Sequence, residues 1–146
     1  MTLKQLSVFL ENKPGALSRA CRLLGNAGIN IQTFALADTQ QFGILRLVVR
    51  EWEQAKSVLE QHGFAVRLTD VVAVEVPDRP GGLAEVLESI ERAQVNVEYM
   101  YAFTAKRDGK GLLLFRFDQP EQAIAQLRSG HLTTVDTAEL FKRLAQ

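Results

Sequence analysis

The stretch that decides the fold occurs twice in this chain, first as Asn12-Lys13-Pro14-Gly15-Ala16-Leu17 and again as Asp78-Arg79-Pro80-Gly81-Gly82-Leu83. The second copy begins 66 residues after the first, and the same spacing pairs Leu24 with Ile90 and Asn30 with Asn96 without a gap. Self-similarity at one fixed spacing is the signature of a duplicated structural unit. The sequence therefore predicts two copies of one small domain.

Each copy of the motif separates a strand pattern from a helix pattern. Before the first copy, Leu6, Val8 and Leu10 alternate with other residues, and only Phe9 interrupts this strand period. After each Pro-Gly, apolar residues recur at the spacing of one buried helix face. They are Leu17, Ala20, Cys21 and Leu24 in the first copy and Leu83, Val86, Leu87 and Ile90 in the second.

The remaining elements also come in pairs, with a spacing of 68 residues after the second, longer hairpin. Strands are predicted at 31–37 and 97–103, at 43–49 and 112–117, and at 64–68 and 132–135, with helices at 51–61 and 120–128. Hairpin turns are predicted at Thr39–Gln41 and at Asp108-Gly109. Gly63 and Gly130 are predicted to end their helices in the left-handed conformation. Residues 136–144 have the pattern of an additional terminal helix.

This order of elements predicts an α+β fold. Each unit has the order βαββαβ, and the rule for crossover connections folds it into a four-stranded antiparallel sheet with both helices on one face, the ferredoxin-like arrangement. Domain one is predicted over 1–70 and domain two over 71–146, including the short C-terminal helix, and the very short link places the copies side by side. Because a core of this size rarely supplies more than ~3 to 5 kcal/mol, we expect the copies to share a contact or the chain to dimerise.

Composition narrows the class of partner. The 146 residues include 17 Lys and Arg and 17 Asp and Glu, so the chain lacks the basic excess that nucleic-acid binding requires. No apolar run approaches the roughly 18 residues that span a bilayer, and no charged and apolar leader precedes the first strand. The single Cys21 cannot form an internal disulfide. We therefore expect a cytoplasmic globular protein with neither a nucleic-acid partner nor a membrane partner.

Side chains able to carry out chemistry are few and scattered. His62 and His131 stand beside glycines that end helices, and Cys21 falls on the predicted buried face of a helix. This arrangement offers neither a set of metal ligands nor a Cys-His nucleophile pair, and the glycines are not grouped into a phosphate-binding loop. The sequence therefore predicts no catalytic residue, no metal, no cofactor and no enzymatic activity.

The duplicated pattern resembles the ACT domain, a ligand-sensing βαββαβ module appended to many enzymes of amino-acid metabolism. Residues 6–19, followed by Ile29-Asn30-Ile31, also resemble the start of the acetolactate synthase small regulatory subunit. The second half departs from that subunit because it carries a complete Pro-Gly turn again. The resemblance therefore implies a tandem ACT protein, without an attached catalytic domain, that senses a free amino acid.

The strand-to-helix corners are the predicted ligand sites. Proline fixes φ and glycine has no Cβ, so each corner turns tightly and leaves the first helical N–H groups uncovered, where they attract a carboxylate. The corner residues of the predicted site are Pro14, Gly15, Ala16 and Leu17 in the first copy and Gly81, Gly82 and Leu83 in the second.

The resemblance to amino-acid-binding ACT domains adds four polar residues, placed where two ACT domains adjoin. It assigns ligand contacts to Asn12 and Asn30 in the first copy and to Asp78 and Asn96 in the second. Because the Asp78 carboxylate suits an ammonium group but repels a ligand carboxylate, one copy is expected to bind while the other supplies the opposite wall. The alternatives are that Asn12 and Asp78 only cap their helices and that Asn30 and Asn96 are only turn residues.

Two predicted strands, residues 33–37 and 99–103, are apolar on both faces, which a sheet with one wet face does not require. A second copy of the chain, giving a homodimer, is the expected cover, and the alternative is the terminal helix around Leu140, Phe141 and Leu144. The leading functional prediction is an amino-acid sensor. The alternative is a regulatory or interaction subunit that docks through this sheet on an amino-acid biosynthetic enzyme.

Overall fold

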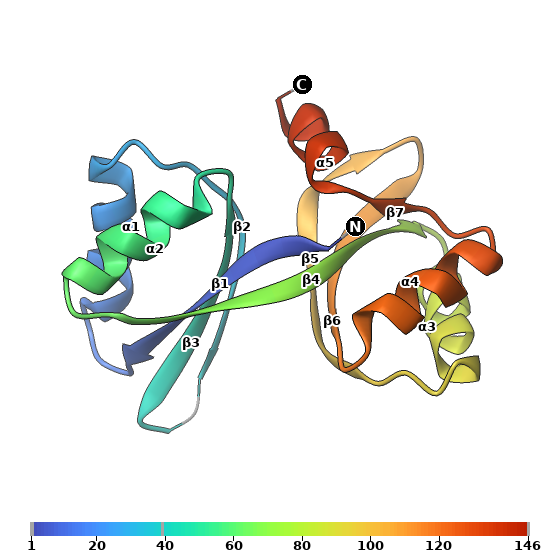
Figure 1. The fold of residues 1–146 in the computed structure, drawn as a ribbon, viewed down its shortest axis with the longest axis horizontal. Coiled ribbons are helices and arrows are strands. Elements are labelled where there is room, and N and C mark those ends of the chain that lie inside the picture. Colours follow the sequence, from blue (N-terminus) through green and yellow to red (C-terminus); the bar gives the residue numbers. More distant parts are fainter. Residues whose placement is uncertain (1, 39, 146) are drawn as a thin grey trace. The chain divides into compact units, whose positions relative to one another are not determined.

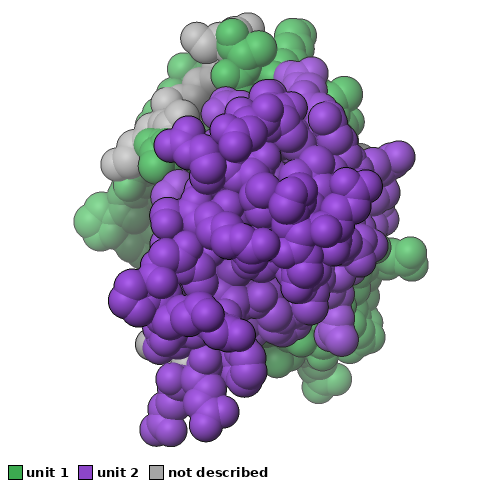
Figure 2. Space-filling model, turned by 90° about the vertical axis from the view of Figure 1, so that its left-hand side faces the viewer, with its two compact units in different colours: residues 1–3, 70–146 green, residues 4–69 purple. Residues whose placement is uncertain are grey.

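The computed structural model describes residues 2–38 and 40–145. It divides into two compact units, which Figure 2 distinguishes by colour. The N-terminal unit comprises residues 4–69, and the C-terminal unit comprises residues 70–146 together with residues 1–3. Each unit contains one copy of the repeat and its own apolar core.

The N-terminal unit has the order strand, helix, strand, strand, helix, strand (Figure 1). Its elements are β1 (Leu3–Glu11), α1 (Ala16–Asn26), β2 (Ile31–Asp38), β3 (Phe42–Val49), α2 (Trp52–Gln61) and the first part of β4 (Ala65–Pro77). The strands lie in the order β2-β3-β1-β4, and β3 is antiparallel to both β1 and β2. Helices α1 and α2 contact each other and share one face of this sheet.

The C-terminal unit repeats the arrangement. Its elements are the rest of β4, α3 (Gly82–Arg92), β5 (Val97–Arg107), β6 (Lys110–Phe117), α4 (Pro120–Ser129), β7 (Thr134–Val135) and α5 (Thr137–Leu144). The strands lie in the order β5-β6-β4-β7 with antiparallel neighbours. The predicted α+β class, with two ferredoxin-like units, is confirmed.

The core of each unit follows from the alternation along its first strand. Leu6, Val8 and Leu10 of β1 are buried with Leu24 of α1 and Leu59 of α2. The corresponding buried residues of the C-terminal unit are Val72, Val74, Val76, Ile90 and Leu127. Because successive strand residues point to opposite faces, the residues between these apolar positions point away from the helices.

The strands differ from their predicted ends in two places. The sequence predicts one strand at 64–68 and another from Val71, but β4 is a single strand over Ala65–Pro77, since no glycine or proline interrupts it before its last residue. The strand predicted at 132–135 is reduced to Thr134–Val135. Thr39, in the predicted first hairpin turn, lies outside the described residues.

One of the two predicted helix-ending glycines behaves differently from the other. Gly63 has a φ of +88°, as predicted, but Gly130 has a φ of −85° and the left-handed residue is His131, with a φ of +59°. A Cβ on Gly130 would lie 3.3 Å from the hydroxyl oxygen of Ser89. The prediction for Gly130 is therefore wrong about φ, because close packing accounts for the glycine at this position.

Helix α5 covers part of the second face of the C-terminal sheet. Leu140 and Phe141 are buried, and the Arg143 guanidinium reaches the Glu75 carboxylate of β4. Glu75 alternates with the core residues of β4, so it points to the face opposite α3 and α4. The terminal helix is thus a cover for this sheet, and none of the helices in the described ranges is long and apolar enough to span a bilayer.

Candidate functional site

The first strand-to-helix corner is open. Gly15 has a φ of +90°, and apart from its chain neighbours no atom lies within 4 Å of the position that a Cβ on it would occupy. Gly15 is itself the residue before α1, and no side chain caps the helix. Since the first N–H groups of a helix lack partners within the helix, this corner presents donors that a ligand can use.

Asn12 and Asp78 do not cap the helices that follow them. The Asn12 backbone N–H donates to the carbonyl of Gln41 at 3.0 Å, which ties the corner to the β2–β3 hairpin. At the second corner the residue before α3 is Gly81, with a φ of +83°, and again no side chain caps the helix. The interpretation of Asn12 and Asp78 as helix caps is therefore wrong.

A pocket of about 640 Å³ lies beside the first corner, within the N-terminal unit. It is formed where the end of β1, the start of α1 and the start of β4 meet. The residues lining it are Phe9, Glu11, Lys13, Pro14, Gly15, Ala16, Arg19, Phe42, Gly63, Phe64 and Ala65. The pocket therefore combines uncapped backbone, charged side chains and aromatic rings.

Arg19 is held at the wall of this pocket by two contacts. Its Nη2 donates to the carbonyl of His62 at 2.8 Å, and its guanidinium carbon lies 4.8 Å from the centre of the Phe64 ring. A cation stacked on an aromatic face gains about 0.5 to 1 kcal/mol at an exposed site. Arg19 is therefore a positioned cation one helical turn from the open corner.

Glu11 and Lys13 form an exposed ion pair at the rim, with 2.9 Å between Nζ and Oε2. The hydrogen bond from Lys13 and its positive charge hold the pKa of the Glu11 carboxyl below its ordinary value. The carboxylate form therefore persists to lower pH than in an isolated glutamate. A group of each charge thus lies at the pocket, which suits a zwitterion.

Lys13→Met is expected to raise the pKa of Glu11 towards its ordinary value, because both the hydrogen bond and the charge that lower it are removed. The interaction is present above the ordinary carboxyl range and is lost as the pH falls through the lowered pKa. An NMR titration of the side-chain carboxyl carbon measures this value. Lys56→Met, which removes the partner of Glu60, is the control and leaves Glu11 unaltered. An unchanged Glu11 pKa in Lys13→Met would contradict the assignment.

Aromatic rings form the apolar part of the pocket. Phe9 and Phe42 come from the neighbouring strands β1 and β3, on the face away from the helices, because Phe42 pairs with Glu11 and Phe9 pairs with Ile44. Their exposed fractions are 39% and 51%. Large exposed rings that gather beside charged groups are typical of a binding surface.

The structure brings together only some of the predicted site residues. Pro14, Gly15 and Ala16 line the pocket, whereas Asn12 and Leu17 are exposed and lie outside its lining. In the second copy Gly81 is exposed, Gly82 is buried and Leu83 is partly exposed. The Asn96 backbone N–H donates to the Asp118 carboxylate at 2.9 Å.

The predicted asparagines of one unit lie at opposite ends of the same sheet. Strands β1 and β2 both pair antiparallel with β3, so they run parallel, and Asn12 follows the end of one while Asn30 precedes the start of the other. About eight strand residues separate the two levels, or about 27 Å. The same holds for Asp78 and Asn96. One unit alone therefore does not place both asparagines on one ligand.

Sequence reasoning missed the residues that give this pocket its character, which are Phe9, Glu11, Lys13, Arg19, Phe42 and Phe64. One signal was present, since Phe9 is the only apolar residue that interrupts the alternation of β1. A large apolar side chain on the polar face of a strand indicates either a cover or a ligand. The approach of Phe64 to Arg19 depends on tertiary structure and has no signal in the sequence.

The described residues contain no group of three or more His, Cys, Asp or Glu side chains arranged to hold a metal ion. Cys21 is a half-buried free thiol. The features that the structure does place together are a duplicated ferredoxin-like fold and, in its first copy, an open strand-to-helix corner beside a mixed polar and aromatic pocket. Fold and site thus define a tandem domain protein built to bind rather than one assembled around a metal.

The chain belongs to the ACT domain pair family, whose model matches residues 1–144. It is 34% identical over 84 residues to the acetolactate synthase small subunit of Buchnera aphidicola subsp. Baizongia pistaciae, covering 56% of this chain and 52% of that protein. A second such subunit, from Buchnera aphidicola subsp. Schizaphis graminum, is 35% identical over 69 residues, covering 47% of this chain and 44% of that protein. The chain spans about half the length of the curated relatives it matches.

Solved structures share the whole fold. A crystal structure of a Bacteroides thetaiotaomicron protein superposes with a TM-score of 0.89 at 34% identity, covering 97% of both chains. The ligand-free regulatory subunit of aspartate kinase from Thermus thermophilus has a TM-score of 0.66 at 18% identity, covering 88% of this chain and 90% of that one. At that level of identity the second likeness shows the fold alone.

Proposed function

We propose that this protein is a non-catalytic regulatory protein that binds a free amino acid in the pocket of its N-terminal unit. The observation that carries the proposal is the composition of that pocket. The uncapped start of α1 and the positioned Arg19 suit a carboxylate, and Glu11 suits an ammonium group. The rings of Phe9 and Phe42 suit an apolar side chain.

The expected affinity is modest. A carboxylate at a helix N-terminus gains about 0.3 to 1 kcal/mol when exposed and about 2 kcal/mol when partly buried. Together with a charged hydrogen bond and some apolar contact, this agrees with a dissociation constant between micromolar and millimolar, roughly −4 to −8 kcal/mol. That is the range in which a sensor responds to metabolite concentrations.

In this proposal an ACT domain of a second copy completes the site, so the working form is a homodimer. Phe34 and Leu36 support a second copy, because they lie on the edge strand β2 with 66% and 51% of their surfaces exposed. Strand edges with exposed apolar side chains pair readily with other chains. Relatives that are named as subunits of acetolactate synthase support an assignment to amino-acid metabolism.

Thermal melting in the presence of each of the twenty standard amino acids tests the proposal. A ligand at 100 times its dissociation constant stabilises the folded state by about 2.7 kcal/mol, and for a chain of this size each kcal/mol raises the melting temperature by roughly 2 to 4 °C. At least one L-amino acid is expected to produce this shift, and its D-enantiomer serves as the control. Melting temperatures unmoved by all twenty would refute amino-acid sensing.

A second candidate function is an interaction subunit of an amino-acid biosynthetic enzyme, which acts through protein contacts alone. The exposed Phe34 and Leu36 also favour this reading. The tests are co-purification with a synthase and a change in synthase activity on mixing. Phe34→Asp is expected to abolish both effects, whereas an intact effect together with silent melting experiments would favour an interface elsewhere on the chain.

A further inference from the structure

The two repeats differ at the positions that build the pocket. At the 66-residue spacing Phe9 corresponds to Glu75, and at the later spacing of 68 Phe42 corresponds to Lys110. The strand registers agree, because Phe42 pairs with Glu11 and Lys110 pairs with Pro77, the residue that corresponds to Glu11. Two rings in the first repeat are thus replaced by two opposite charges in the second.

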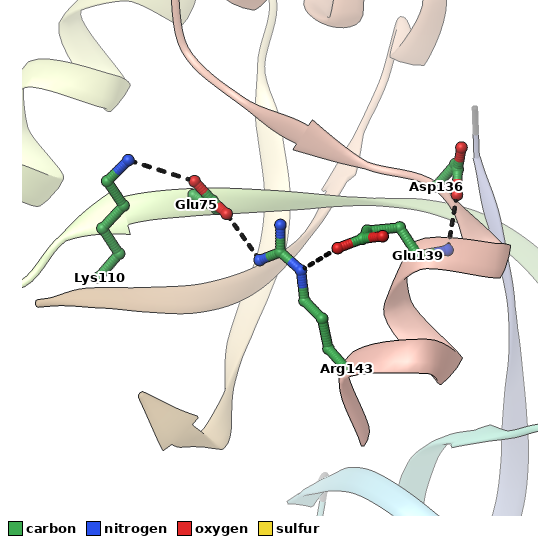
Figure 3. Close-up of polar contacts among 5 residues, drawn as sticks. All are labelled: Glu75, Lys110, Asp136, Glu139 and Arg143. Carbon is green, nitrogen blue, oxygen red and sulfur yellow. Dashed lines mark hydrogen bonds and ion pairs between the residues drawn. The ribbon is translucent and has the colours of Figure 1, made fainter. Parts of the chain in front are cut away.

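These charges belong to a closed network under α5 (Figure 3). The Glu75 carboxylate accepts from Lys110 Nζ at 3.4 Å and from Arg143 Nη1 at 2.6 Å. Arg143 Nε donates to Glu139 at 2.8 Å, and Asp136 caps the helix by accepting from the Glu139 N–H. The Glu75 side chain is only 14% exposed. The place that is open in the first repeat is therefore filled by the chain itself in the second.

The corner of the second repeat differs in shape as well. Ala16 corresponds to Gly82, and a Cβ on Gly82 would overlap the backbone carbonyl oxygen of Pro77. The second corner is therefore packed directly on β4. The first corner accommodates the Ala16 methyl group, which forms part of the pocket lining.

The corner cation is also reversed. Arg19 corresponds to Glu85, whose carboxylate pairs with Arg79 at 2.8 Å. Where the first repeat presents a guanidinium near its open helix start, the second presents a carboxylate that repels the carboxylate of an amino acid. Charge, shape and the cover supplied by α5 thus separate the two repeats in the same sense.

We propose that the two repeats have divided roles, so that each chain binds a single amino acid, in the N-terminal unit, while the corresponding place in the C-terminal unit anchors α5. This inference rests on the proposed function and adds a stoichiometry to it. Phe9 and Phe42 are then specificity-determining residues, and Glu75, Lys110 and Arg143 hold the structure of the second unit.

Isothermal titration calorimetry of the full chain with each of the twenty L-amino acids tests this division. One ligand per chain is expected. The double substitution Phe9→Glu with Phe42→Lys places the charge pair of the second repeat in the first, and it is expected to weaken binding at least tenfold. Both side chains are partly exposed, so the fold is preserved, which circular dichroism checks.

Glu75→Gln is the matched control, because Glu75 occupies the position corresponding to Phe9. It is expected to lower the melting temperature, since Arg143 and Lys110 lose their shared carboxylate, while affinity and stoichiometry stay unchanged. Two ligands per chain, or full affinity in the Phe9 and Phe42 double variant, would overturn the division of roles and leave amino-acid sensing intact. Heat released by none of the twenty would overturn both.

Discussion

Gly82→Ala is expected to lower the free energy of unfolding by about 3 kcal/mol, the upper end of the range for overpacking a close contact. The added Cβ would overlap the carbonyl oxygen of Pro77. Both groups are fixed to backbone, so relief requires a shift of α3 against β4. Urea denaturation followed by far-UV circular dichroism measures the change.

Ala16→Gly is the matched control at the corresponding position of the first repeat. It adds no atom and costs only the backbone freedom of glycine, about 0.5 to 1 kcal/mol. The difference between the two variants isolates the close approach at the second corner from the general cost of changing a helix start. A loss below about 1 kcal/mol for Gly82→Ala would show that this corner opens without strain.

Arg19→Glu is expected to weaken amino-acid binding by about 100-fold, or about 2.7 kcal/mol. Hydrogen bonds to charged groups contribute about 1.5 to 3 kcal/mol, and the substitution also replaces attraction with repulsion of the ligand carboxylate. It introduces the residue type that the second repeat carries at the corresponding position, Glu85. Calorimetric titration measures the loss.

Arg22→Glu makes the same change of net charge one turn further along α1, outside the lining of the pocket. It is expected to change affinity less than threefold, because an exposed charge at that distance is screened by solvent and salt. Equal losses in both variants would indicate a general electrostatic effect and not a contact made by Arg19. Melting of the ligand-free variants accounts for any loss of the contact with Phe64.

The fold was predictable because local signals agreed with one another. The duplicated Pro-Gly corner gives the strand-to-helix turn twice, and the change of apolar period around it identifies the elements on either side. The one misjudged boundary, at β4, arose because the end of one repeat and the start of the next have the same strand propensity. No local signal marks a repeat boundary inside a strand.

The site was predictable only where backbone conformation defines it. Gly15 was found because the corner requires a left-handed residue. Phe42 and Phe64 escaped because their approach to the corner depends on strand pairing and on the packing of Arg19. Asn30 was grouped with the corner by resemblance, whereas the crossover helix carries the chain back to the far end of the sheet before that residue.

The C-terminal helix shows how duplication shapes a chain. After the first copy, β4 passes directly into the second, so no segment is available there to fold back over the sheet. After the second copy such a segment exists, and it supplies Arg143 to a carboxylate where its sister copy keeps a phenyl ring. Identical ancestors thus diverged according to what followed each of them, one retaining an accessible surface and the other acquiring an internal brace.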